Sequence, residues 1–209
     1  MSKLSRLLLA FASVLLLAAL ALPLWRISLL APQYPEGLGM EIHARTVVGA
    51  TEHDLENINE LNHYIGMKAI APADIPELRI IPWFIVGLAA LSLVAALVGK
   101  RAIVWTWLVS FASLGIVGMW DFWHWEYSYG HDIDVAHAII KIPGMSYQPP
   151  LIGTKQLLNF TASAWPSTGT LLIGAAFLLG VVSLLLEGRG AERTEGNSAP
   201  LAALHELHA

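Results

Sequence analysis

The sequence contains no cysteine, and this absence removes several classes of site. Without thiols the chain has no disulfide bond, no c-type haem attachment, no iron–sulfur cluster and no thiolate zinc site. Any transition-metal site must therefore be built from imidazole, thioether, carboxylate or backbone groups.

Charged residues are also scarce, at 13% of the 209 residues, whereas 56% are hydrophobic. Four runs contain no charge and no histidine, namely residues 7–25, 81–99, 102–120 and 169–186. Each approaches the ~20 residues that a helix needs to cross a bilayer. The lack of ionisable groups in the runs excludes a bis-histidine haem and the usual intramembrane proton relay. The sequence therefore predicts an all-α membrane protein with four transmembrane helices.

The distribution of Lys and Arg predicts the orientation of the chain. Half of the basic residues lie at the amino terminus, after residue 186 and between the second and third runs. Because positive residues favour the cytoplasmic side, we expect both termini to be inside. The predicted divisions are a first transmembrane helix in 1–25, outer loops in 26–80 and 121–168, a helical hairpin in 81–120, a fourth helix in 169–186, and a cytoplasmic tail in 187–209.

The first apolar run has a second interpretation. Lys3 and Arg6 precede it, and the A-L-A-L-P segment resembles the cleavage region of a signal peptide. Its apolar stretch is longer than the ~7–15 residues typical of such peptides, so we favour a retained anchor. In both interpretations the segment that follows lies outside the cytoplasm.

The two outer loops are expected to fold together into a small periplasmic domain. A short strand is predicted at residues 40–48, which include several β-branched residues. Thr51, followed three residues later by Asp54, is typical of a helix start, and Gly66 is a natural stop. Residues 138–160 contain prolines and glycines that favour a non-helical crossing, which ends in a short helix or strand.

Motifs of common enzyme classes are missing. The chain has no G-x-S-x-G, no H-E-x-x-H and no phosphate-binding glycine loop. The two outer loops hold twelve acidic and six basic residues, which leaves no basic groove for nucleic acid. These absences count against hydrolytic chemistry and nucleic-acid binding.

Six of the eight histidines lie in the two outer loops. Imidazole with thioether, in a chain without cysteine, is the ligand set expected for copper in an oxidising compartment. His63 and Met67 are four residues apart, so on a helix they lie on one flank and can share a metal ion. The alternative is a local hydrogen bond for His63 and packing for Met67, and the spacing alone does not separate the two.

Met40 and His43 form a second candidate pair in the first loop. Their spacing of three suits a helical turn, whereas on the predicted strand they face opposite sides, which argues against joint binding. His53 lies among acidic residues at a helix start and is expected to be a solvated surface group. His205 and His208 belong to the inner tail, where they cannot share a metal with the outer histidines.

The second loop supplies His124, His131 and His137. The segment H-D-x-D-x-x-H over residues 131–137 combines imidazole with carboxylate, which suits zinc or Cu(II). The aromatic residues around His124 equally fit an interfacial belt of Trp and Tyr at headgroup depth. Met145 follows a Pro-Gly turn, where it either displays a soft ligand or packs.

Three runs carry a family resemblance: A-P-Q-Y-P-E-G-L, L-N-H-Y-I-G-M and Y-Q-P-P-L-I-G-T-K-Q-L-L-N-F. They resemble bacterial multi-pass membrane proteins associated with gene clusters for nitrous oxide reductase and other periplasmic copper enzymes. The likeness covers residues 31–67 and 120–160. It implies a location in the bacterial inner membrane. His63 and Met67, and more weakly His131 and Met145, fall inside matching runs.

The resemblance implies an accessory protein that binds copper and delivers it to a periplasmic respiratory copper enzyme, such as nitrous oxide reductase in denitrification. One alternative is a non-catalytic structural or docking subunit of a respiratory membrane complex that holds no metal. A less favoured alternative is a metal-dependent membrane enzyme that uses His131, Asp134 and His137. The expected partners are the lipid bilayer and a periplasmic copper protein or respiratory subunits.

Overall fold

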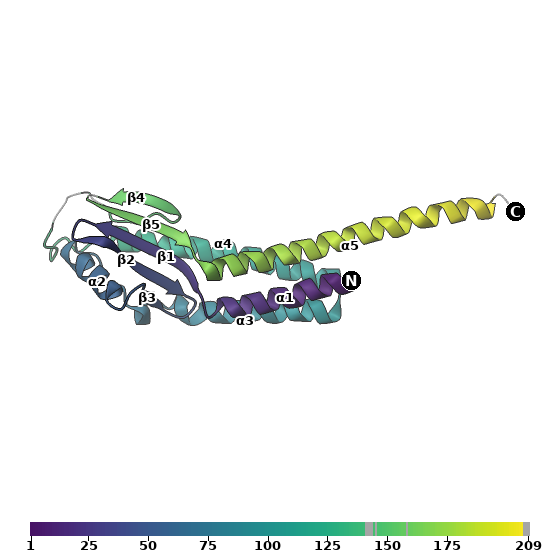
Figure 1. Cartoon of the computed structure of the whole chain (residues 1–209), viewed down its shortest axis with the longest axis horizontal. Helices are drawn as coiled ribbons and strands as arrows, with labels where there is room; N and C mark the ends of the chain where they lie inside the picture. The colour runs from purple at the N-terminus through teal and green to yellow at the C-terminus, as the bar shows by residue number, and fades with distance from the viewer. Residues whose placement is uncertain (141–143, 145, 158, 207–209) are drawn as a thin grey trace.

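The computed structural model describes the backbone of residues 1–140, 144, 146–157 and 159–206, and the side chains of these residues as far as residue 187. A bundle of helices forms one part of the molecule, and a sheet flanked by helices forms the other (Figure 1). The last helix continues past the bundle toward the C-terminus.

The sheet has five antiparallel strands in the order β3-β2-β1-β5-β4. A two-residue turn joins β1 (Pro23–Ala31) to β2 (Tyr34–His43), and β3 (Val47–Gly49) pairs with the far side of β2. A second hairpin contains β4 (Gly153–Leu157) and β5 (Phe160–Pro166), and β5 pairs with β1. The β1–β5 pairing holds the two polar segments of the chain together in one sheet.

The prediction of an all-α protein is therefore wrong, and β1 illustrates the physical reason. Trp25 and Ile27 are buried while Arg26 between them is exposed, which is the alternation of a strand with one face on a core. The first apolar run was predicted to be helical as far as Trp25. The helix ends at Ala19 instead, and Pro23, which has no N–H to donate, begins β1.

The bundle consists of α1 (Lys3–Ala19), α3 (Glu77–Val98), the first part of α4 (Arg101–His131) and the first part of α5 (Thr168–Glu206). Its core contains the fully buried Trp107, whose indole N–H donates to the Leu88 carbonyl oxygen at 2.8 Å. The glycine at 180 makes room for this ring, since a Cβ there would lie 2.1 Å from Trp107 Cζ3.

Three of the helices in the described chain are long and apolar enough to cross a membrane: Glu77–Val98, Arg101–His131 and Thr168–Glu187. α1 has only 17 residues, so the prediction of four spanning helices is wrong. The bundle exposes large apolar side chains, among them Leu97 at 66% and Ile116 at 72%. These surfaces are compatible with lipid contact, and the helices indicate that the protein is associated with a membrane.

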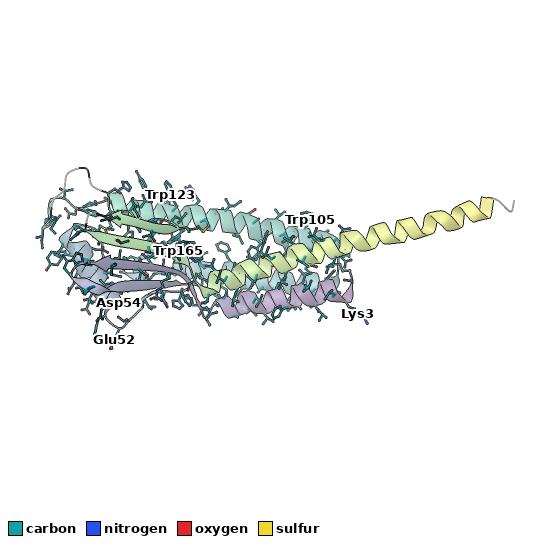
Figure 2. The ribbon with its side chains drawn as sticks, turned by 45° about the horizontal axis from the view of Figure 1, so that its top comes forward. Lys3, Glu52, Asp54, Trp105, Trp123 and Trp165 are labelled. Atoms are coloured by element: carbon teal, nitrogen blue, oxygen red, sulfur yellow. The ribbon has the colours of Figure 1, made fainter. Side chains whose placement is uncertain are left out.

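α4 is longer than a membrane span requires, because its 31 residues extend over about 46 Å. Trp105 lies beside the bundle, whereas Trp123 lies beside the sheet (Figure 2). Phe122 contacts Trp25 of β1 edge to face, with ring centroids 5.3 Å apart, and Trp125 packs against the same core. The last turns of α4 thus belong with the sheet.

α2 (Asp54–Tyr64) covers the sheet, and η1 (Pro72–Asp74) leads from it toward α3. The helix predicted between Thr51 and Gly66 is confirmed, with Ile58 buried on its inner face. Gly66 has φ +78°, and the Met67 N–H donates back to the Asn62 carbonyl oxygen at 2.8 Å, which caps the helix. We call the sheet, α2, η1 and the last turns of α4 the sheet domain.

Asp54 ties α2 to the sheet. Its carboxylate accepts the backbone N–H of Gly39 at 2.9 Å and of Thr51 at 3.2 Å, and it also accepts the Thr51 hydroxyl. Burial acts to raise the pKa of Asp54, but the hydrogen bonds from Thr51 and Gly39 and the nearby Arg26 lower it below the ordinary value. Asp54 is therefore an ionised structural group.

Candidate functional site

His63 and Met67 line two different hollows. His63 is exposed on α2 and faces a shallow surface hollow beside Glu56 and Glu60. Met67 lines a deeper cavity inside the sheet domain. The helix that was to hold both residues ends at Tyr64, so their spacing of four is not a helical spacing in the structure. Metal binding by this pair stays a prediction that the geometry does not favour.

Met40 and His43 lie on β2 and are also separated. Met40 is buried and lines the same cavity as Met67. His43 is at the end of the strand, where its Nε2 atom lies 3.8 Å from Glu41 Oε2. A separation of three residues places the two side chains on opposite faces of the strand.

Each histidine of the second segment has a local partner. His124 stacks on Trp120 with ring centroids 5.6 Å apart, and His131 stacks on Tyr127 at 3.9 Å. His137 is exposed, and its Nδ1 atom lies 2.7 Å from Asp134 Oδ2. Met145 is outside the described residues.

No group of three or more His, Asp or Glu side chains that could hold a metal ion occurs in the described part of the chain. Asp132, one of the carboxylates of the H-D-x-D-x-x-H segment, is ion-paired with Lys68. Asp134 is paired with His137. The residues proposed for a metal-dependent enzyme are therefore engaged with their own neighbours.

Met40 and Met67 line a partly open cavity in the sheet domain, with a volume of about 520 Å³. β1, β2, α2, the end of α4 and the β4–β5 hairpin all contribute to its wall. The wall is mostly apolar, and its aliphatic and aromatic residues include Ile27, Leu29, Ile58, Ile70, Trp125 and Phe160. We refer to it below as the cavity.

Glu126 is the one fully buried charged residue of the described chain, and it lines the cavity. Neither of its carboxyl oxygens has a hydrogen-bond partner among the described residues. Glu126 lies beyond Trp120, where the uncharged run of α4 ends, in the turns that pack on the sheet. Burial raises the pKa of Glu126 to about 8, so the carboxyl group is mainly protonated at neutral pH.

Tyr147 provides a second buried polar group in the cavity wall. Its hydroxyl also lacks a hydrogen-bond partner among the described residues, and burial raises the pKa of Tyr147. The segment that carries it is fixed to α4, because the Tyr147 N–H donates to the Gly130 carbonyl oxygen at 3.0 Å. A Cβ on Gly130 would lie 2.4 Å from Gln148 Cα, so only glycine permits this approach.

The arrangement is that of a ligand site rather than of a nucleophilic centre. It combines a mostly apolar cavity with a few polar groups that lack partners, which is the usual composition of small-molecule pockets. Glu126 is spaced by four from Phe122 and from Gly130, so the three residues lie on one face of α4. The structure, and not the sequence, shows that this face packs against the sheet domain.

Comparison with known proteins does not assign the chain to a protein family. The chain matches no protein-family model, and no curated protein matches it in sequence.

Proposed function

We propose that this is a membrane-anchored binding protein whose sheet domain takes a small, mostly apolar organic molecule into the cavity. The observation that carries the proposal is the buried Glu126, whose carboxyl oxygens lack partners, among the residues that line a mostly apolar cavity. The volume of about 520 Å³ lies within the ~300–1,000 Å³ common for small-molecule sites.

The energetic cost of the buried polar groups supports the proposal. A buried donor or acceptor without a partner costs on the order of 1–3 kcal/mol. Both Glu126 and Tyr147 carry such groups, and both line the cavity. A ligand with a polar group at one end of an apolar body would satisfy them and fill the remaining volume.

Calorimetric titration of the full chain in detergent with cyclohexylmethanol tests the proposal. We expect saturable binding to the wild type and at least tenfold weaker binding to Ala162→Leu, because Ala162 lines the cavity. Ser163→Leu is the matched control, since it adds the same side chain to the opposite face of β5. Equal affinity of Ala162→Leu and the wild type would place the ligand elsewhere.

For the orientation, we propose that the sheet domain lies on the periplasmic side of a bacterial inner membrane. The support is the concentration of Lys and Arg near residues 100 and 101 and near the termini, away from the sheet. The absence of cysteine allows a direct test with single-cysteine variants. A membrane-impermeant maleimide should label Glu52→Cys in intact spheroplasts and should leave Lys100→Cys unlabelled; the reverse pattern would invert the orientation.

Copper handling for a periplasmic respiratory enzyme stays our second proposal, as implied by the family resemblance. The observation that favours it is that the thioether residues Met40 and Met67 both line the cavity that contains Glu126. Soft thioether ligands suit Cu(I). In this version the cavity would hold the ion, and His63 on the surface would assist its transfer.

Metal analysis of purified protein loaded with Cu(I) separates the two proposals. The wild type would be compared with Met40→Ala/Met67→Ala, His63→Ala/Met67→Ala and His131→Ala/His137→Ala. Stoichiometric copper that is lost with either methionine-containing pair would support copper handling. Substoichiometric copper in all four proteins would remove that proposal and leave the organic ligand, or a docking subunit without metal.

A further inference from the structure

The charged residues among the described lining of the cavity are all acidic. Glu60 and Glu126 are the carboxylates among the described lining residues, and none of these residues is Lys, Arg or His. The other titratable lining groups are phenols, those of Tyr34, Tyr64, Tyr129 and Tyr147. An anionic ligand such as a fatty acid or a phosphate would find no countercharge in this wall, and burying it there would be costly.

Glu126 and Glu60 differ in exposure. Glu60 is exposed at the rim, where water solvates its carboxylate. Glu126 is fully buried, and both of its oxygens lack partners. A buried carboxylate becomes stable once a cation pairs with it and donates hydrogen bonds. The described lining residues include no such cation, and a cationic ligand would supply one.

Aromatic rings surround the same volume. Trp125 and Tyr129 lie against each other with ring centroids 4.5 Å apart, and both line the cavity together with Phe160 and several tyrosines. The faces of Trp and Tyr attract cations, and such cation–π contacts are stronger where water is excluded. Aromatic rings with carboxylates, and without basic groups, form a typical environment for an ammonium ion.

We infer that the cavity selects an organic cation, a molecule with an apolar body and an ammonium group whose charge the Glu126 carboxylate balances. The inference rests on the proposed function, because it names the ligand class of the same cavity. When the ammonium ion enters, the Glu126 O–H bond breaks and the proton passes to solvent. Each carboxyl oxygen then accepts N–H hydrogen bonds from the ligand, and the Tyr147 hydroxyl provides a further acceptor.

Three probes of matched shape test the inference by calorimetry on the full chain: cyclohexylmethylamine, cyclohexylmethanol and cyclohexanecarboxylate. We expect the amine to bind at least tenfold more tightly than the alcohol, and the carboxylate to bind most weakly. Glu126→Gln should remove the preference for the amine and keep binding of the alcohol. Glu52→Gln should behave as the wild type, because the exposed Glu52 does not line the cavity.

A second readout requires only the wild-type protein. Binding of the amine near neutral pH should release about one proton, seen as a binding enthalpy that varies with the ionisation enthalpy of the buffer. Binding of the alcohol should release none. Equal affinities for amine and alcohol, or binding of the amine without proton release, would overturn the inference and leave the proposed function standing. Failure of all three probes to bind would overturn both.

Discussion

The backbone of Gln148 crosses the last turn of α4 directly against Gly130. A Cβ on Gly130 would lie 2.4 Å from both the N and the Cα atom of Gln148, closer than real side chains approach. The adjacent Tyr147 is held in the cavity wall by its hydrogen bond to the Gly130 carbonyl oxygen. This contact therefore fixes one side of the cavity.

Replacing Gly130 with alanine should destabilise the sheet domain, because the new methyl group would force the 146–149 segment away from α4. We expect a loss of roughly 1–3 kcal/mol, as is usual for overpacking, seen as a lower Tm. Gly118→Ala in the same helix is the control, since its Cβ would meet no atom within 4 Å. An unchanged Tm in Gly130→Ala would contradict the close approach.

Replacing two alanines of β5 with leucine tests whether the cavity can accept a larger side chain. Ala162 and Ala164 are both fully buried on the same face of the strand, but only Ala162 lines the cavity. Leucine at position 162 should extend into the cavity and change the Tm little, whereas leucine at position 164 should overpack the core and cost roughly 1–3 kcal/mol. Equal losses in thermal unfolding would show that the cavity cannot accept added volume.

The stability of the protein should depend on pH through Glu126. The pKa of this carboxyl group is about 8 in the folded protein, against an ordinary value of 4.5. Between these values the unfolded chain loses a proton that the folded chain retains, so the free energy of unfolding decreases as the pH rises. The wild-type Tm should fall from about pH 5 to about pH 8.

Glu126→Gln should flatten this dependence, because the amide does not titrate. The matched variant Glu60→Gln should retain the wild-type slope, since Glu60 is exposed at the rim of the same cavity. If the wild type and Glu126→Gln had parallel Tm profiles between about pH 5 and pH 8, the carboxyl group would not be held protonated in the fold.

Asp54 should make the free energy of unfolding depend on pH in the acidic range. Its pKa lies below the ordinary 3.8 in the folded protein, so its stabilising effect is complete above that value. The effect is lost as the pH falls through the lower, folded-state pKa. Asp54→Asn should cost about 1–3 kcal/mol at neutral pH, because an amide cannot accept all the hydrogen bonds from Gly39 and Thr51.

Denaturant titration at neutral pH and in acid measures this effect. Glu52→Gln, an exposed neighbour in the same turn, should change stability by less than about 0.5 kcal/mol. A neutral-pH loss in Asp54→Asn no larger than that of Glu52→Gln would mean that the carboxylate does not anchor α2.

The sequence correctly predicted the helices that contain a long run of uncharged, apolar residues. Uncharged runs of sufficient length identified α3, the first part of α4 and the first part of α5. The strand predicted at residues 40–48 corresponds to the end of β2 and to β3. β1, β4 and β5 were not assigned as strands, because their signal depends on the tertiary context. Ala162 and Ala164 are the buried residues of β5, and their small side chains give the strand little hydrophobic alternation.

The candidate site was less predictable than the helices. A spacing of four residues brings two side chains to one flank only while the chain stays helical. Gly66 turns the chain between His63 and Met67, so these two side chains do not share a flank. Met40 and Met67 are far apart in sequence, and only the packing of α2 on the sheet brings both into one cavity wall. The role of Glu126 depends on which face of α4 meets the sheet, and no pattern within the helix specifies that partner.

The response of the methionine methyl groups to ligand tests whether the cavity of the sheet domain binds a small apolar molecule. Met40 and Met67 line the cavity, whereas Met1 and Met119 do not. In NMR spectra of methyl-labelled protein titrated with cyclohexylmethanol, we expect saturable shifts of the Met40 and Met67 resonances and none for Met1. Saturable shifts confined to Met1 or Met119, with Met40 and Met67 unchanged, would contradict binding in the cavity.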